Sequence, residues 1–232
     1  MTTIDASVKA GRKAATARLR SIFLAGPEGR LEAVVNEGAP DAPLAALVCH
    51  PHPKGGGTLH NKVVYHAMKT LNAPEWGLRW PVLRFNFRGT GLSEGEHDGT
   101  DESNDVLAAL NWLENEYARP IVVAGFSFGA AMALKACMET GTPMRAAAAL
   151  GLPTHAEGRT YRYSFLKHLH LPKLFISGDR DQYASQTELE NVVAAASEPR
   201  KLVLVPGADH FFTGQLELMQ SALDGWLKEQ VL

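Results

Sequence analysis

The segment with the clearest chemical potential in this sequence is Gly125 to Gly129, which reads Gly-Phe-Ser-Phe-Gly and holds Ser127 at its centre. An apolar run typical of a buried strand, Ile121 to Ala124, leads into it, and an alanine-rich run that favours a helix, Ala130 to Met138, follows. A sharp turn between a strand and a helix exposes such a serine as a nucleophile, and the flanking glycines are needed because the strand and helix pass too close for side chains. The alternative is a serine that only caps the helix. The strand–turn–helix context favours the nucleophile.

A serine hydroxyl is a weak nucleophile, so it requires a base and a carboxylate that orients the base. In a strand–turn–helix architecture of this kind the partners follow the serine in the order acid, then histidine. Asp179 and Asp181 follow one predicted strand, and His210 follows the next. Asp179 comes directly after a glycine and suits the turn itself, whereas Asp181 lies further out, where it can reach an imidazole. The sequence therefore predicts a catalytic triad of Ser127, Asp181 and His210.

Acyl transfer also requires two backbone N–H groups directed at the negative oxygen of the tetrahedral intermediate. Phe128, the residue after the nucleophile, is expected to supply one of them. The other should come from the loop after the predicted strand Leu44 to Cys49, where residues 50–53 read His-Pro-His-Pro. Because proline has no N–H, His52 is the predicted second donor of the oxyanion hole.

Aromatic residues flank the predicted catalytic groups and indicate an apolar substrate. We expect Phe126, Phe211 and Phe212 to contact the substrate, which favours short or medium acyl chains over charged ones. The alternative for each ring is packing in the core. Small carboxylic esters are the first expectation, and thioesters, lactones and peptide or other amides are alternatives because the same triad can cleave them.

Strand-like apolar runs alternate with helical patterns along most of the chain. The predicted strands are Ser21–Leu24, Leu31–Asn36, Leu44–Cys49, Trp80–Phe87, Ile121–Ala124, Arg145–Leu150, Lys173–Ser177 and Lys201–Val205, and the main predicted helices are Asn61–Leu71, Thr100–Tyr117, Ala130–Met138, Thr187–Ala196 and Thr213–Glu229. This alternation predicts a mostly parallel sheet with helices on both faces, and such sheets bind ligands beyond the carboxyl ends of their strands.

The chain is expected to form an N-terminal arm over residues 1–20 and a single domain over residues 21–232. Residues 152–171 are the only connection long enough for a lid, and they are few for one, so an open or lightly capped site is expected.

Composition excludes several other classes of protein. With 45% hydrophobic and 21% charged residues, the 232-residue chain is typical of a soluble globular domain. A formal net charge of -2 predicts no recruitment of nucleic acid or of an acidic membrane surface, and no apolar run reaches the length of a membrane span. Cys49 and Cys137 fall in a predicted core strand and a predicted core helix, which indicates free thiols and a cytoplasmic location. The sequence specifies no oligomeric state.

Several separated motifs are similar to those of a bacterial branch of the α/β-hydrolase superfamily that is often described as dienelactone-hydrolase-like. They lie in Cys49 to Gly57, Asn61 to Val64, Arg84 to Gly95, Gly125 to Gly129, Tyr163 to Leu166 and Gly178 to Asp181. The resemblance covers nearly everything after residue 20, and it implies an α/β-hydrolase fold without a large cap and with a Ser–Asp–His triad. True dienelactone hydrolases use a cysteine nucleophile, so with Ser127 the resemblance does not imply dienelactone activity.

Three other interpretations compete with a serine hydrolase. A metal site could be built from four histidines that follow a core strand: His50, His52, His60 and His66. No carboxylate cluster accompanies them. The segment Gly89 to Gly95 follows a strand as a phosphate loop does, but its spacing departs from the dinucleotide motif. A catalytically silent hydrolase fold that only binds ligands is the third alternative. The sequence favours a serine hydrolase that uses neither cofactor nor metal and whose partner is a small-molecule ester.

Overall fold

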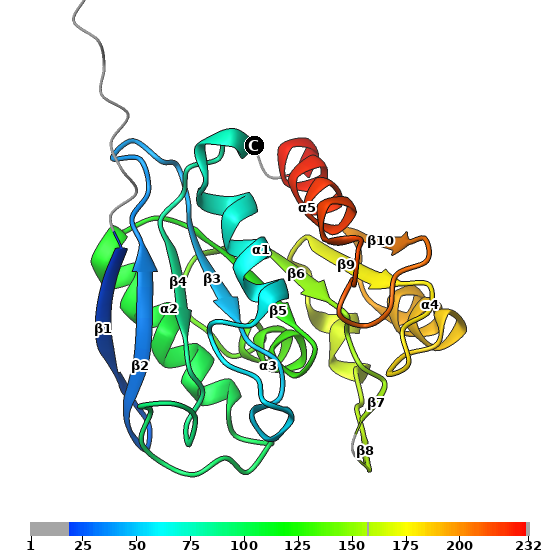
Figure 1. Ribbon diagram of the computed structural model, residues 1–232, viewed down its shortest axis with the longest axis horizontal. Helices are drawn as coiled ribbons and strands as arrows, with labels where there is room; N and C mark the ends of the chain where they lie inside the picture. Colours follow the sequence, from blue (N-terminus) through cyan, green and yellow to red (C-terminus); the bar gives the residue numbers. More distant parts are fainter. Residues whose placement is uncertain (1–18, 157, 231–232) are drawn as a thin grey trace, which may run out of the picture.

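The apolar runs of the sequence assemble into one eight-stranded sheet (Figure 1). The computed structural model describes residues 19–156 and 158–230. The strand order is β1-β2-β4-β3-β5-β6-β9-β10. In this order, β2 is antiparallel to both of its neighbours, and every later pair of neighbouring strands is parallel. The strands span β1 (Leu19–Gly26), β2 (Gly29–Asn36), β3 (Ala45–Cys49), β4 (Val82–Phe85), β5 (Ile121–Phe126), β6 (Met144–Leu150), β9 (Lys173–Gly178) and β10 (Arg200–Val205).

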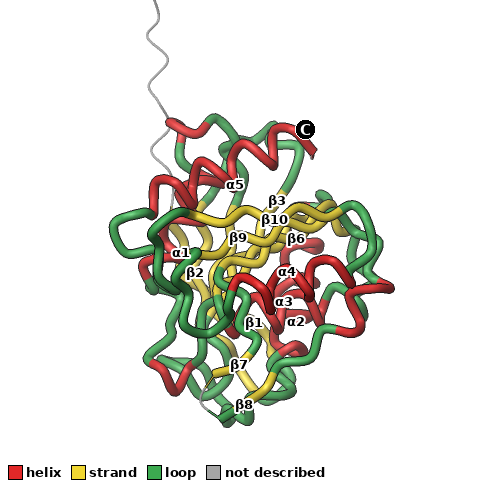
Figure 2. Tube along the Cα trace, turned by 90° about the vertical axis from the view of Figure 1, so that its right-hand side faces the viewer, coloured by secondary structure: helices red, strands yellow, loops and turns green. Residues whose placement is uncertain are grey.

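Helices cover both faces of the sheet (Figure 2). One face carries α1 (Lys62–Asn72) and α5 (Leu216–Gln230), and the other carries α2 (Ser103–Tyr117), α3 (Phe128–Ala136) and α4 (Gln186–Ala195). In the described part of the chain, short 3-10 helices lie in three of the connections, at η1 (Pro53–Gly55), η2 (Pro74–Trp76) and η3 (Ser164–His168). The structure confirms the predicted α/β class and the mostly parallel sheet. Among the described residues, no helix has both the length and the apolar character needed to cross a bilayer.

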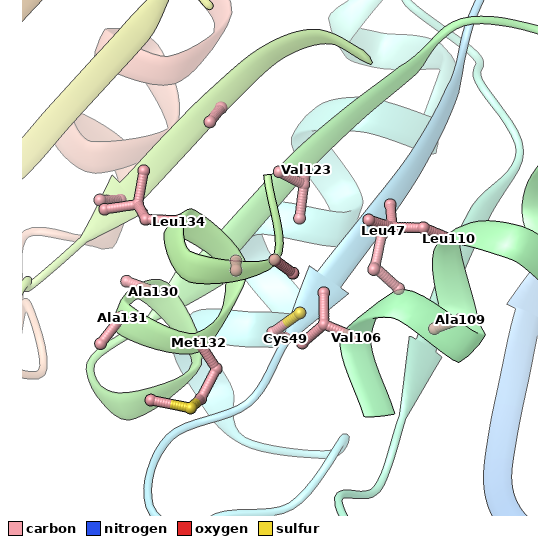
Figure 3. Close-up of a cluster of buried hydrophobic side chains, with 14 of the residues drawn as sticks. Leu47, Cys49, Val106, Ala109, Leu110, Val123, Ala130, Ala131, Met132 and Leu134 are labelled. Atoms are coloured by element: carbon pink, nitrogen blue, oxygen red, sulfur yellow. The ribbon is translucent and has the colours of Figure 1, made fainter. Parts of the chain in front are cut away.

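The central strands are buried on both faces, which explains why they read as continuous apolar runs. Every residue of β3 and of β5 is buried. Because side chains alternate along a strand, Leu47 and Val123 pack with α2 and α3 on one face (Figure 3). Their neighbours Val48 and Val122 pack with α1 and α5 on the other. Each strand thus contributes to two cores, and this fixes its register.

The parallel strands end at the same edge of the sheet. In register, Cys49 at the end of β3 pairs with Gly125 of β5, and Phe126 pairs with Leu150 at the end of β6. Gly178 at the end of β9 pairs with Val205 at the end of β10. The loops that follow these strands therefore emerge side by side, and they are the loops that carry the predicted site residues.

Two details of the chain differ from the sequence-based expectation. The strand β1 begins at Leu19, so Leu19 and Arg20 belong to the sheet and not to an N-terminal arm; residues 1–18 of the predicted arm lie outside the described residues. The segment 152–171 contains a small hairpin of β7 (His155–Ala156) and β8 (Arg159–Thr160), which the sequence did not indicate. Two-residue strands are too short to carry a period-2 pattern. The described residues of this segment form just this hairpin and η3, so the expected minimal cap is confirmed.

Candidate active site

Ser127 occupies the turn between β5 and α3, with a backbone φ of 56° and ψ of -121°. A positive φ is costly for a residue with a side chain, and neighbouring backbone holds it, since the Ser127 N–H donates to the Leu150 carbonyl at 2.9 Å. A Cβ on Gly125 would lie 2.4 Å from the carbonyl oxygen of Gly129, and one on Gly129 would lie 2.3 Å from that of His50. The close approach of strand, turn and helix therefore requires both glycines.

The hydroxyl of Ser127 heads a chain of three hydrogen-bonded side chains. Ser127 Oγ lies 2.9 Å from His210 Nε2, and His210 Nδ1 lies 2.8 Å and 3.0 Å from the two carboxylate oxygens of Asp181. Because a carboxylate only accepts, Nδ1 carries the ring proton, and Nε2 is left to accept the hydrogen bond of the serine hydroxyl. The three residues come from the loops after β5, β9 and β10, and none is more than 9% exposed. A base in this position can take the proton of the serine as it attacks.

The two candidate acids lie in different parts of the loop after β9. The Asp181 carboxylate, besides facing His210, accepts hydrogen bonds from Ser177 Oγ at 3.1 Å and from the backbone N–H of Tyr183 at 2.8 Å. These two hydrogen bonds fix its orientation. Asp179 instead accepts a hydrogen bond from the backbone N–H of Gly207 at 2.8 Å, so it ties the loops after β9 and β10 together. Asp181 is therefore the carboxylate beside the imidazole, and Asp179 has the turn-shaping position that the sequence suggested for it.

The turn after β10 presents His210 and is closed by its neighbour Asp209. The Asp209 carboxylate accepts hydrogen bonds from the backbone N–H groups of Thr213 at 2.9 Å and Phe211 at 3.0 Å. These bonds, with that of Thr213 foremost, lower the pKa of Asp209. Three aromatic rings lie within 5.2 Å of the imidazole, measured between centroids: Phe126, Tyr183 and Phe211. The imidazole is thus held by rings as well as by its carboxylate.

His50 fixes the direction of the loop after β3. Its Nε2 accepts a hydrogen bond from the backbone N–H of Phe87 at 2.9 Å, so the neutral ring carries its proton on Nδ1, which donates to the Pro51 carbonyl at 2.6 Å. Burial lowers the pKa of His50 to about 3, which keeps the ring neutral. In the planar trans peptide between Pro51 and His52, a carbonyl directed at His50 turns the N–H of His52 the opposite way. His50 therefore orients the predicted donor His52.

The other predicted donor, Phe128, is the first residue of α3. The first N–H groups of a helix have no partner within it. The fully buried Phe128 ring contacts the His52 ring, with 5.0 Å between the centroids. The two predicted donors thus belong to loops that pack against each other.

A cavity of about 70 Å³ adjoins Ser127 and His210. It is lined by Pro51, His52, Gly55, Asn61, Ser127, Ala156, Tyr161, Tyr183, His210 and Phe211. Phe211 is 45% exposed and lines this cavity, and its contact with substrate stays a prediction. The same prediction is wrong for Phe126 and Phe212, which are fully buried in the core and do not line the cavity. Phe126 ends the buried strand β5 beneath His210, and Phe212, at a φ of 53°, turns inward against the core.

The protein-family model for the alpha/beta hydrolase domain matches residues 46–226, which include nearly all of β3, the strands that follow it, and Ser127, Asp181 and His210. The chain belongs to the α/β-hydrolase family. This chain is similar to RP471 of Rickettsia prowazekii, an uncharacterized protein. The two are 36% identical over 215 residues, which cover 89% of this chain and 87% of the relative.

Two solved structures show how this hydrolase compares with known ones. XC6422 of Xanthomonas campestris, described as an α/β serine hydrolase without lid, superimposes with a TM-score of 0.78 and 29% identity over 92% of this chain and 95% of its own. An α/β serine hydrolase homologue of Coxiella burnetii superimposes with a TM-score of 0.80 and 32% identity over 90% of this chain and 97% of its own. The short β7–β8 hairpin is in keeping with a lidless member of the family.

The four histidines considered as metal ligands do not converge in this hydrolase. Both ring nitrogens of His50 are engaged with backbone groups, and His66 Nδ1 lies 2.9 Å from Gln220 Oε1 on α5. Across residues 19–156 and 158–230, no group of three or more His, Cys, Asp or Glu side chains is arranged to hold a metal ion.

The glycine-rich loop after β4, which was considered as a phosphate loop, is anchored by Arg88. The Arg88 guanidinium donates to the buried Asp105 at 2.8 Å.

Sequence reasoning missed the residues that support the candidate triad. Ser177 and Tyr183 hold Asp181, and Tyr161 and Tyr183 line the cavity. Ser177 and Tyr183 stand within four residues of Asp181, so a polar residue at the end of the buried strand β9 was an available signal. The position of Tyr161 follows only from the way the β7–β8 hairpin folds over the site.

We expect His50 to make stability depend on acid pH. Its folded pKa of about 3 lies below the ordinary value of 6.5, so between these pH values the unfolded chain binds the extra proton. Its contribution to stability is therefore complete above pH 6.5 and falls by about 1.4 kcal/mol per pH unit as the pH drops toward the folded pKa. Urea unfolding between pH 6 and pH 4 gives the free energy of unfolding of the wild type and of His50→Asn at each pH. Its slope against pH should be smaller for the variant by about 1.4 kcal/mol per pH unit.

A direct measurement accompanies that comparison. In an NMR titration of the wild-type histidines, the ring signals of His50 should show no protonation above pH 4. Equal slopes for the two proteins, or a His50 that titrates near its ordinary pKa, would contradict the orientation assigned to this ring.

Proposed function

We propose that this protein is a serine hydrolase that cleaves small carboxylic esters through an acyl-enzyme. The observation that carries the proposal is the continuous hydrogen-bonded chain from Ser127 through His210 to Asp181, with the serine beside a cavity. Membership of the α/β-hydrolase family supports hydrolytic chemistry of this kind. The serine-hydrolase descriptions of the Xanthomonas and Coxiella proteins support it further.

In the proposed reaction, His210 takes the proton of Ser127 at Nε2 while Ser127 Oγ attacks the ester carbonyl. The imidazolium that forms lies against the Asp181 carboxylate, which stabilises its charge. The tetrahedral intermediate collapses as the imidazolium gives its proton to the leaving alcohol, and an acyl-enzyme remains. Water, deprotonated by the same imidazole, then attacks the acyl group. The bond between the acyl carbon and Ser127 Oγ breaks as the imidazolium gives this proton to Oγ, and the carboxylic acid is released.

The negative oxygen of the intermediate requires donors in fixed positions. We assign this role to the backbone N–H groups of His52 and Phe128. The support is the bond from His50 to the Pro51 carbonyl, which orients the first, and the position of the second at the start of α3. The N-terminal end of a helix also carries a partial positive charge, which favours an anion there.

The size of the cavity supports a small acyl group. At about 70 Å³ it is far below the roughly 300–1,000 Å³ of sites for drug-sized ligands. Its walls combine the rings of Tyr161, Tyr183 and Phe211 with the polar Asn61. Such a wall suits a short, uncharged acyl chain.

We also propose a cytoplasmic location for this hydrolase. Cys49 and Cys137 are free thiols, and burial raises the pKa of both, so they remain protonated and unreactive. Buried free thiols are typical of proteins from reducing compartments.

Replacing Ser127 by alanine should lower kcat for a nitrophenyl acetate by about three orders of magnitude or more, because the nucleophile is lost while the fold is not. A fluorophosphonate should label the wild type on Ser127, as located by mass spectrometry of the digested protein, and should leave the variant unlabelled. A folded wild type that neither reacts with the reagent nor cleaves any ester would instead be a catalytically silent member of the family. Activity that persists in the variant would rule out Ser127 as the nucleophile.

The two aspartates provide a matched pair for testing the acid. Asp181→Asn should lower kcat by about four orders of magnitude, since the amide no longer holds the productive tautomer of His210. Asp179→Asn keeps an acceptor for the Gly207 N–H and should remain within about threefold of the wild type. Equal losses in the two variants would contradict the assignment of Asp181.

A series of nitrophenyl esters with acyl chains from acetyl to decanoyl tests the substrate class. We expect kcat/KM to be highest for acetyl or propionyl and to fall at least about tenfold by octanoyl, because a small pocket excludes the longer chains. An acetyl thioester and an aminoacyl amide belong in the same assay. A preference for either over the ester would assign the protein to that alternative class.

A further inference from the structure

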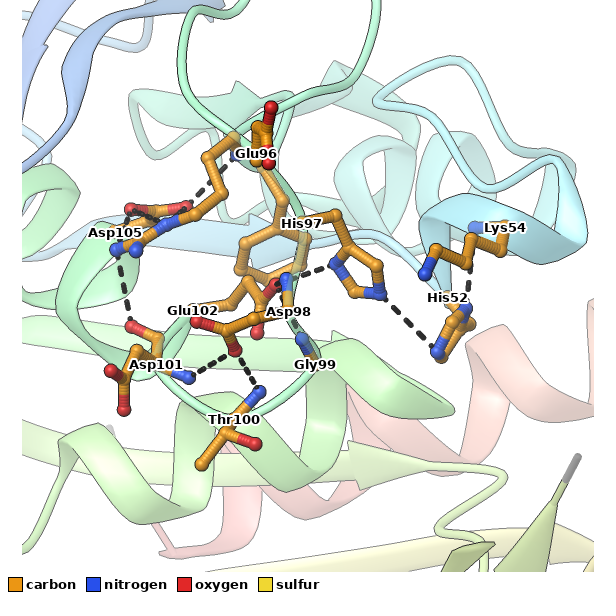
Figure 4. Close-up of polar contacts among 12 residues, drawn as sticks. His52, Lys54, Glu96, His97, Asp98, Gly99, Thr100, Asp101, Glu102 and Asp105 are labelled. Carbon is orange, nitrogen blue, oxygen red and sulfur yellow. Dashed lines mark hydrogen bonds and ion pairs between the residues drawn. The ribbon is translucent and has the colours of Figure 1, made fainter. Parts of the chain in front are cut away.

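A second pair of buried polar residues lies behind the loop that carries His52 (Figure 4). His97 and Glu102 belong to the connection between β4 and α2, and their side chains are 6% and 0% exposed. His97 Nε2 lies 3.4 Å from His52 Nε2, and His97 Nδ1 lies 2.5 Å from Glu102 Oε1. The steps of the proposed reaction leave this pair without a role.

One arrangement of protons fits the contacts along this chain when both rings are neutral. The backbone N–H of Lys54 donates to His52 Nδ1 at 3.2 Å, so His52 carries its proton on Nε2. That proton faces His97 Nε2, which must then accept it, and His97 carries its own proton on Nδ1, toward Glu102. Burial is the largest influence on His97 and lowers its pKa, which favours the neutral ring that this order requires.

The carboxylate at the end of the chain is firmly held. Glu102 Oε1 accepts hydrogen bonds from the backbone N–H groups of Gly99 at 2.9 Å and Asp98 at 3.0 Å. The loop around it is anchored in turn, because Arg88 donates both to Asp105 and to the carbonyl of Asp101. Glu102 is therefore a fixed point against which His97 is oriented.

Ring packing links this chain to the nucleophile turn. The His97 ring contacts the His52 ring at 4.7 Å and the Phe128 ring at 5.5 Å between centroids, and His52 and Phe128 contact each other at 5.0 Å. The three rings form a cluster in which each contacts the other two. Two of its members, His52 and Phe128, are the residues proposed to donate to the oxyanion.

We propose that His97, held by Glu102, is a positioning residue that sets the oxyanion hole through the His52 ring. This inference rests on the proposed function. The order carboxylate–imidazole–donor repeats that of Asp181, His210 and Ser127, but here it fixes a loop and transfers no proton. His97 should therefore affect kcat and not substrate binding, because the substrate oxygen carries the charge that the N–H groups stabilise only in the transition state.

The test uses His97→Phe, which keeps a ring but removes the link to Glu102, and Glu102→Gln, which keeps the shape but removes the charge. Matched controls are the exposed His60→Phe and the exposed neighbour Glu96→Gln. Both test variants should lower kcat for the acetyl ester by about 10- to 100-fold, the effect expected of a displaced catalytic donor, with KM nearly unchanged. The controls should match the wild type. Thermal unfolding verifies that each variant is folded, and His97→Gln replaces His97→Phe where the latter is not.

Two further measurements separate positioning from general damage to the fold. An alkylboronic acid forms a tetrahedral adduct with the nucleophile, so its affinity should fall by the same factor as kcat across the variants. His52→Ala keeps the backbone N–H and removes the ring, and the double variant with His97→Phe should lose no more activity than His52→Ala alone, since His97 acts through that ring.

Unchanged kcat in folded His97 and Glu102 variants, losses that multiply in the double variant, or unaltered boronate affinity would each overturn the positioning role. Those results leave the serine hydrolase in place as long as activity depends on Ser127. Activity that survives Ser127→Ala would instead remove the proposed function and this inference together.

Discussion

The geometry of the site depends on how closely backbone segments approach one another at the turn of Ser127. A side chain on Gly125 would collide with the start of α3, and one on Gly129 would collide with the carbonyl of His50. Only this contact allows α3 to begin directly at the nucleophile and allows the loop after β3 to lie against it. The strained backbone at Ser127 is the local cost, and the hydrogen bond to Leu150 together with the buried strands on both sides stabilises it.

Imidazole rings with a fixed proton arrangement connect the loops around this turn. His210 has a carboxylate on one nitrogen and the serine hydroxyl on the other, and His50 has a carbonyl on one and an N–H on the other. His52 and His97 continue the pattern toward Glu102. Because a neutral imidazole offers one donor and one acceptor in fixed directions, each ring transmits the orientation of one loop to the next. The site is thus organised by histidines of which only one would move a proton in the proposed reaction.

Aromatic residues near the site divide into two groups by their burial. Phe126 and Phe128 are fully buried and contact imidazole rings, and Phe212 is fully buried in the core, whereas Phe211 is exposed on the cavity wall. Adjacent positions in the chain therefore have different uses, as Phe211 and Phe212 show.

The sequence by itself determined the fold class and the candidate triad. Strands buried on both faces must be apolar throughout, as β3 and β5 are, and a turn too tight for Cβ atoms must place glycines around Ser127; both constraints are local and therefore visible in the chain. Asp181 and His210 could be assigned because parallel strands bring the loops after β5, β9 and β10 to one edge. Which aromatic ring faces the cavity, and the joining of His97 to His52 across 45 positions, were decided only by the tertiary structure. Those contacts depend on how loops without periodic patterns fold against each other, and no local property of the residues encodes that.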